Sequence, residues 1–157
     1  MLEIRPAKPG DAALIFDFVR KLAEYEKLLH MVVATEADIA RDLFGPHPRV
    51  FCHLAFWEGA PAGFALWFHI YSSFHARHGI YLEDLFVEPA YRGRGIGKAL
   101  LRHLAQRCET EGFNRLEWQA LNWNKPSIDF YKSLGAVEVD DWTVFRLADY
   151  ALKKLAE

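Results

Sequence analysis

The chain has 157 residues, of which 52% are hydrophobic and 25% charged, and its formal net charge at pH 7 is -2. This balance is typical of one globular domain with its own core, and it excludes a protein that binds nucleic acid or an anionic membrane through a strongly basic surface. No apolar run reaches the roughly 18 residues of a membrane-spanning helix and no signal-peptide pattern opens the chain, so we expect a cytoplasmic protein.

The N-terminal part of the chain predicts one strand and two helices. Residues 2–6 alternate in polarity as a short strand, and apolar residues at helical spacing predict a helix over residues 13–23 with Asp11 at its N-cap. An acid three residues after Thr35 is a capping-box pattern that predicts the start of a second helix, and Gly45 predicts its end.

Three strands and a long helix are expected in the middle of the chain. The strands cover residues 50–57, 62–70 and 80–87. A polar, His-rich connection over residues 71–79 precedes the last of them. The helix begins at Ile96 and ends at Gly112, and its apolar residues recur one turn apart on one face.

The C-terminal part predicts a strand over residues 115–119, a short helix over 125–134, a pair of strands over 136–147 and a last helix over 148–155. Together the elements indicate an α/β protein of the α+β type. We expect a single domain over residues 1–157, with a mixed, mostly antiparallel sheet of about six to seven strands flanked by helices.

The stretch YRGRGIGKALL spends three glycines in five positions between a strand and a helix. In this arrangement free backbone N–H groups and the helix dipole converge on an anion, and we expect a phosphate site. A P-loop is excluded because Arg92 and Ala99 stand where it needs a glycine and a Ser or Thr, and the dinucleotide fingerprint fails because Lys98 replaces its third glycine. A glycine-rich turn that only starts the helix is the alternative.

The remaining pattern, Arg92-x-x-Gly95-x-Gly97, resembles the pyrophosphate-binding loop of the GNAT N-acetyltransferases. That family follows the loop with an Asn and then an aromatic pair before a glycine, as this chain does from Asn124 to Gly135. The resemblance covers essentially the whole chain. More narrowly, the chain resembles the spermidine/spermine and thialysine N-acetyltransferase branch in the stretches RPAKPGDA, LAEYEKL, YLEDLFV, YRGRGIGKALL and NWNKPSIDFYKSLGA.

The resemblance implies a GNAT fold, acetyl-CoA as co-substrate, a small-molecule amine as acceptor and a homodimer. The cofactor-binding residues that it implies are Leu85, Phe86 and Val87 for the pantetheine, Arg92, Gly93, Arg94, Gly95, Ile96, Gly97 and Lys98 for the pyrophosphate, and Asn124, Lys125, Pro126 and Ser127 for the far side of the cofactor arm. Tyr131 would stand near the sulfur. Tyr25, Glu26 and Glu83 would contact the amine, and Glu83 would also be the base.

The chemistry of acetyl transfer gives these two catalytic residues a physical role. An alkyl amine with a pKa of about 10.4 is mostly protonated at neutral pH, so its attack on a thioester needs a base or a desolvating pocket. Glu83 lies mid-strand, where we expect partial burial to raise the pKa of its carboxyl group, while strand alternation predicts that Asp84 points to the opposite face. The Tyr131 phenol is a fitting proton donor to the departing thiolate, and the backbone N–H of Val87 is the candidate oxyanion donor.

Plainer interpretations of the same residues stay open. Glu83 could be an acid at a solvated strand edge, and Tyr131 an aromatic residue of the core. Acids on the first two helices, Glu24, Glu26, Asp38 and Asp42, could gather a polyamine or only form a solvated surface.

We expect no metal, because His69, His75 and His78 lack a completing ligand set, and we expect both cysteines to be reduced core thiols. The turn over residues 58–61 is shorter than in the animal enzymes of the branch that the chain resembles, and the loop over residues 72–78 differs from theirs in composition. Both segments could shape the entrance for the substrate, so the precise amine stays open. An enzyme acetylating a protein or peptide amine, and a non-catalytic acyl-CoA-binding module, are the alternative functions.

Overall fold

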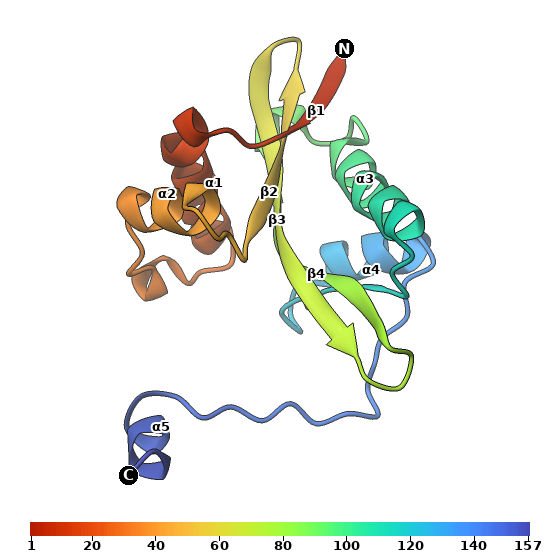
Figure 1. Cartoon of the computed structure of the whole chain (residues 1–157). Helices are drawn as coiled ribbons and strands as arrows, with labels where there is room; N and C mark the ends of the chain where they lie inside the picture. The colour runs from red at the N-terminus through yellow and green to blue at the C-terminus, as the bar shows by residue number, and fades with distance from the viewer. The chain divides into compact units, whose positions relative to one another are not determined.

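The computed structural model describes residues 1–157 (Figure 1). They divide into two units, Met1–Gln119 and Ala120–Glu157. The first unit holds the sheet and the second holds two short helices. A single domain over the whole chain stays a prediction.

The sheet of the first unit has five strands in the order β1-β2-β3-β4-β5. They are β1 (Leu2–Pro6), β2 (Phe51–Trp57), β3 (Ala60–Ser72), β4 (Arg77–Val87) and β5 (Leu116–Glu117). The first four pair antiparallel in sequence order, and β5 pairs parallel with β4. The mixed, mostly antiparallel sheet is confirmed, with fewer strands than expected.

Helices cover both faces of this sheet (Figure 1). They are α1 (Ala12–Tyr25) and α2 (Glu36–Phe44) on one face and α3 (Ile96–Glu111) on the other. Under α1 and α2 lies a continuous apolar core made of Ile15, Phe18, Leu43, Cys52, Leu54, Phe64, Leu66 and Phe86. Beneath α3, Leu100 and Leu104 are fully buried, as the one-turn spacing of its apolar residues predicts.

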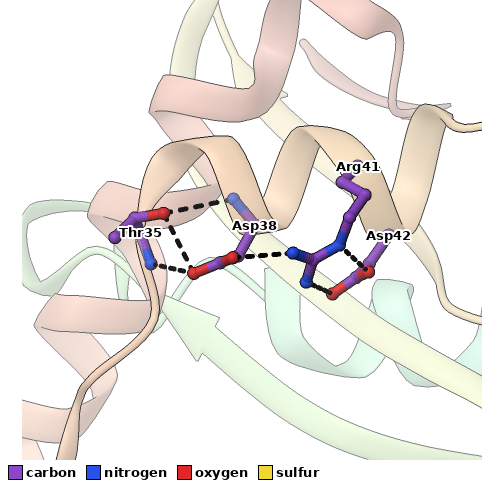
Figure 2. A network of polar contacts seen from close by, with 4 residues as sticks. All are labelled: Thr35, Asp38, Arg41 and Asp42. Atoms are coloured by element: carbon purple, nitrogen blue, oxygen red, sulfur yellow. Dashed lines mark hydrogen bonds and ion pairs between the residues drawn. The ribbon is translucent and has the colours of Figure 1, made fainter.

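The start of α2 carries the expected capping box (Figure 2). The hydroxyl of Thr35 accepts a hydrogen bond from the Asp38 backbone N–H at 3.2 Å, and the Thr35 N–H donates to the Asp38 carboxylate at 2.8 Å. One turn on, Arg41 donates to both Asp38 and Asp42, at 3.0 and 2.9 Å. Asp38 and Asp42 are therefore already paired with a cation of their own helix, which argues against their gathering an amine.

Asp11 occupies the N-cap position of α1, but its side chain makes no capping hydrogen bond to that helix. Its carboxylate instead accepts two hydrogen bonds from the Arg5 guanidinium, at 2.7 and 3.1 Å, and one from the Lys8 backbone N–H. The guanidinium contact lowers the pKa of the Asp11 carboxyl group below its usual value. This ion pair ties β1 to the start of α1.

The second unit contains α4 (Lys125–Ser133) and α5 (Asp149–Leu155), both close to their predicted ranges. The strand pair expected over residues 136–147 is wrong, because no strand is formed there. Alternating apolar residues favour a strand, but a strand also needs a hydrogen-bonded neighbour, and within this unit there is none. The apolar side chains of this segment are exposed, among them Trp142 at 75% and Phe145 at 90%.

None of the helices combines the length and the apolar composition that crossing a membrane requires. Both cysteines, Cys52 and Cys108, are free and buried, as expected for core thiols. No group of three or more His, Cys, Asp or Glu side chains could hold a metal ion.

Candidate functional site

An irregularity in β4 lies at the predicted catalytic base. Residues 84–87 of β4 pair with 63–66 of β3, and residues 77–82 pair with 67–72, so that Glu83 is left without a partner across the ladder. This is the two-against-one count of a β-bulge, a feature that re-aims side chains and is common beside active sites. The strict alternation that we expected for β4 therefore breaks at Glu83.

The bulge changes the environment of the two neighbouring acids. Glu83 is exposed, so the expected burial of its carboxyl group is wrong, and Asp84 is the partly buried residue. Asp84 pairs with Leu66, whose side chain belongs to the core beneath α1. Burial, reinforced by the charges of Glu83 and Glu26, raises the pKa of Asp84 to about 7.

The end of α1 brings the predicted amine contacts to the same place. Tyr25 is the last residue of this helix and Glu26 is its C-cap. Burial raises the pKa of the Glu26 carboxyl group, and the negative charge of Glu83 raises it further. Glu26, Glu83 and Asp84 thus form a carboxylate group whose members interact electrostatically, and Asp84 is the member that sequence reasoning missed. The only sequence signal for it was an acid in an apolar strand, which alternation assigned to the other face.

The glycine loop has the backbone geometry of an anion site. Gly93 and Gly95 both have positive φ, at 78° and 76°, and Gly95 is the N-cap of α3. A Cβ atom added at either glycine would meet nothing within 4 Å, so the loop is open on its outer side. The first N–H groups of α3 are free of helical partners by geometry, and such an end favours negative charge. These residues fit the pyrophosphate of a coenzyme.

The two arginines of the loop rest on aromatic rings rather than extending freely. Arg92 donates from Nε to the carbonyl oxygen of Val87 at 2.9 Å. The guanidinium carbon of Arg94 lies 5.1 Å from the centre of the Trp57 ring. Arg92, Arg94 and Lys98 are exposed, and so are Gly93 and Gly95. This edge of the loop therefore carries positive charge near its glycines.

The remaining predicted residues lie on α4 in the second unit. Asn124 is its N-cap and is buried, with a relative exposure of 7%. The Lys125 ammonium pairs with Asp129 at 2.6 Å, and Pro126 stands in the first turn, where a missing N–H costs nothing. Tyr131 lies one turn after Ser127 on the same helix, and its backbone oxygen accepts from the Leu134 N–H at 3.0 Å.

Strand geometry, glycine loop and helix order together define the class of the protein. Residues 16–136 match the model of the Acetyltransferase (GNAT) family. The chain belongs to this family, and it is an amine N-acetyltransferase.

Curated relatives extend the match over nearly the whole chain. The chain is 38% identical to thialysine N-epsilon-acetyltransferase of Sus scrofa over 98% of its own length and 96% of that protein's. It is 34% identical to spermidine/spermine N(1)-acetyltransferase-like protein 1 of Homo sapiens, over 92% of this chain and 22% of that protein.

A solved structure shares the fold. An integron cassette protein from the mobile metagenome of V. cholerae superposes with a TM-score of 0.82 at 30% identity, covering 99% of this chain and 98% of that one. The expectation of a GNAT fold is confirmed.

Proposed function

We propose that the protein transfers the acetyl group of acetyl-CoA to a primary amine of a small polyamine, diamine or thialysine-like substrate, by direct attack in a ternary complex. The observation that carries this proposal is the carboxylate group Glu26, Glu83 and Asp84 on the unit that also holds the open glycine loop. The carboxylate group suits a cationic amine, and the glycine loop suits an anionic coenzyme.

Acetyl-CoA is the co-substrate of the family, and it would supply an activated acetyl group as a thioester. In this chain the backbone N–H groups around Gly93, Gly95 and the first turn of α3 would hold the pyrophosphate, with Arg94 and Lys98 adding positive charge. The backbone of Leu85, Phe86 and Val87 would bind the pantetheine, and Asn124, Lys125, Pro126 and Ser127 the other side of the arm.

The amine must lose a proton before it attacks. Glu26 and Tyr25 at the end of α1 would bind the ammonium group, and Glu83 would accept its proton directly or through water. The exposed position of Glu83 at a bulge gives its carboxylate access to an incoming substrate. Asp84, with its pKa near neutrality, would adjust the charge of the same group.

The leaving thiolate needs a proton, and Tyr131 on α4 is the proposed donor. A phenol with a pKa of about 10 can protonate a thiolate whose thiol pKa is about 8.5 only with a modest uphill step, which a positioned hydrogen bond removes. The resemblance of NWNKPSIDFYKSLGA to the family supports this role.

We also propose a homodimer, as the resemblance implies. The exposed side chains of residues 137–147 support it, because aromatic residues bury about 150–250 Å² each and a specific interface buries about 1,200–2,000 Å² in total. Trp142 and Phe145 from two copies would supply a large share of that area. A variant with Trp142→Lys and Phe145→Lys should sediment as a monomer.

The test of the proposed reaction follows free thiol release from acetyl-CoA with a panel of amines: spermidine, spermine, putrescine, thialysine, lysine, aminoglycosides and a basic peptide. Selective turnover of one small amine supports the proposal and names the substrate class. Turnover of the peptide alone would favour a protein-modifying enzyme. Binding of acetyl-CoA in calorimetry without any turnover would favour a non-catalytic acyl-CoA-binding module.

A further inference from the structure

Arg92 makes three contacts that lead away from the glycine loop. Its Nε donates to the carbonyl oxygen of Val87 at 2.9 Å. Its guanidinium carbon lies 5.3 Å from the centre of the Tyr25 ring and 5.5 Å from that of Phe86. All three partners belong to α1 or the end of β4, so the side chain lies against the strand that precedes the loop.

The Tyr25 contact has the geometry of a cation–π interaction, since the cation lies within about 6 Å of the ring centre. A guanidinium group can stack on a ring and donate in its own plane at once, which the ammonium group of lysine cannot do. The hydrogen bond to Val87 fixes where the plane lies, and the ring of Tyr25 is thereby fixed relative to β4.

A second contact joins the same two segments. The Lys21 ammonium group pairs with Glu88, just after β4, and with Asp17 one turn back on α1 at 3.0 Å. Lys21 and Tyr25 are four residues apart and so lie on one face of α1. Their partners, Glu88 and Arg92, are also four residues apart in the chain. The C-terminal part of α1 is therefore joined at two points to the segment that leads from β4 into the loop.

We infer that Arg92 is a positioning residue that couples the glycine loop to the amine side of the site by holding Tyr25 against the end of β4. The inference rests on the proposed function and deepens it, because it assigns an amine-binding effect to a residue of the coenzyme loop. Arg92 would act on acceptor binding through Tyr25, and not as a phosphate contact of its own.

The two roles of Arg92 predict different kinetics. A phosphate-binding side chain would, when removed, weaken coenzyme affinity and leave the KM for the amine in place. A positioning side chain would raise the KM for the amine. We expect Arg92→Gln to raise that KM by about fivefold or more, within the usual range of coupling between sites, and to change CoA affinity in calorimetry by less than about threefold.

A double-mutant cycle separates positioning from general loosening of the fold. In a Tyr25→Leu background, which removes the ring, Arg92→Gln should add little to the KM for the amine. In a Tyr25→Phe background, which keeps the ring, the effect of Arg92→Gln should persist. Lys21→Met is the matched control, because it breaks the other contact between α1 and the loop without touching Tyr25.

Three results would overturn the inference. They are a loss of CoA affinity in Arg92→Gln with an unchanged KM for the amine, additive effects of Arg92→Gln and Tyr25→Leu, and an equal rise of that KM in Lys21→Met. Failure of the proposed function looks different, since the wild-type protein would then bind no CoA or acetylate no amine of the panel.

Discussion

Asp84 is partly buried and directly follows Glu83, which is exposed. Glu83 is the extra residue of the β4 bulge and has no partner on β3. The two carboxylates are neighbours in sequence but differ in their access to water. Burial and the charge of Glu83 raise the pKa of Glu26, and the charges of Glu83 and Glu26 add to the burial that raises the pKa of Asp84. Near neutral pH the charge of this carboxylate group therefore changes through the partly buried Asp84, while the exposed Glu83 remains accessible to an incoming amine.

The first prediction concerns the pH dependence of the reaction. Asp84 ionises with a pKa of about 7, so the group gains a negative charge as the pH rises through that value, and a cationic amine should bind better above it. We expect kcat/KM for the amine to rise through this range in the wild type and Asp84→Asn to remove most of the rise. An unchanged pH profile in Asp84→Asn would assign the ionisation to another group. Glu109→Gln, on the exposed side of α3, is the control.

The second prediction concerns stability. The pKa of Asp84 is higher in the folded chain than its ordinary value of 3.8, so between about pH 4 and 7 the folded state binds more protons than the unfolded state. The free energy of unfolding should then fall as pH rises through this window and level off above it. Asp84→Asn should remove this slope and stabilise the protein at pH 8 by up to about 4 kcal/mol, at about 1.4 kcal/mol per pKa unit. Urea denaturation of both proteins across the window measures the difference.

The third prediction tests the proposed proton donor. Tyr131→Phe removes only the phenol oxygen, and we expect turnover to fall by more than about tenfold, a loss typical of general-acid groups, with little change in coenzyme affinity. Stopped assays of thiol release give the rate and calorimetry gives the affinity. Phe130→Leu, the neighbouring ring on α4, controls for lost packing. Near-normal turnover in Tyr131→Phe would remove this residue from the acid role.

The fourth prediction tests the glycine loop. Gly95 has positive φ and open space where a side chain would begin, so a bulky residue there would fill the volume that the pyrophosphate is proposed to occupy. We expect Gly95→Trp to abolish CoA binding in calorimetry while the circular dichroism spectrum is kept. Gly59→Trp is the matched control, because this glycine also has positive φ and open surroundings but lies in the turn between β2 and β3. Unchanged CoA affinity in Gly95→Trp would place the coenzyme elsewhere.

Local patterns predicted most of the secondary structure. The capping box at Thr35 depends only on residues three apart, and the buried face of α3 follows from its one-turn apolar spacing. The bulge at Glu83 could not be predicted, because alternation assumes a regular ladder and the extra residue appears only when β4 is paired with β3. The strands expected over residues 136–147 failed because alternation does not specify a neighbouring strand.

The candidate site could likewise be predicted from the sequence only in part. Glycine spacing alone predicted a tight turn before α3, since positive φ is a local requirement that Gly93 and Gly95 meet. The Arg92 side chain lies against the ring of Tyr25, which is far away in sequence. The burial of Asp84 depends on the core beneath α1. Both are products of tertiary packing, and no spacing within β4 or the loop encodes them.

The last prediction concerns the face of the sheet that α3 covers. Trp67 donates its indole N–H to Nδ1 of His53 at 3.1 Å, and the His53 ring lies 4.5 Å from that of His103 on α3. Burial, with the charges of His103 and Arg107, lowers the pKa of His53 from 6.5 to about 4. A protonated Nδ1 could not accept the indole hydrogen bond, so acid removes a buried contact between β2 and β3.

The sign of the pH effect follows from this shift. Between about pH 4 and 6.5 the unfolded chain binds more protons at this residue than the folded chain, so the free energy of unfolding should fall as the pH drops through that window. His53→Gln keeps an acceptor but does not titrate, and we expect it to lose up to about 3 kcal/mol less than the wild type across the window, at about 1.4 kcal/mol per pKa unit. The pKa of His103 is also lowered, so part of the acid sensitivity should remain. Equal slopes in the two proteins would show that folding does not lower the pKa of His53.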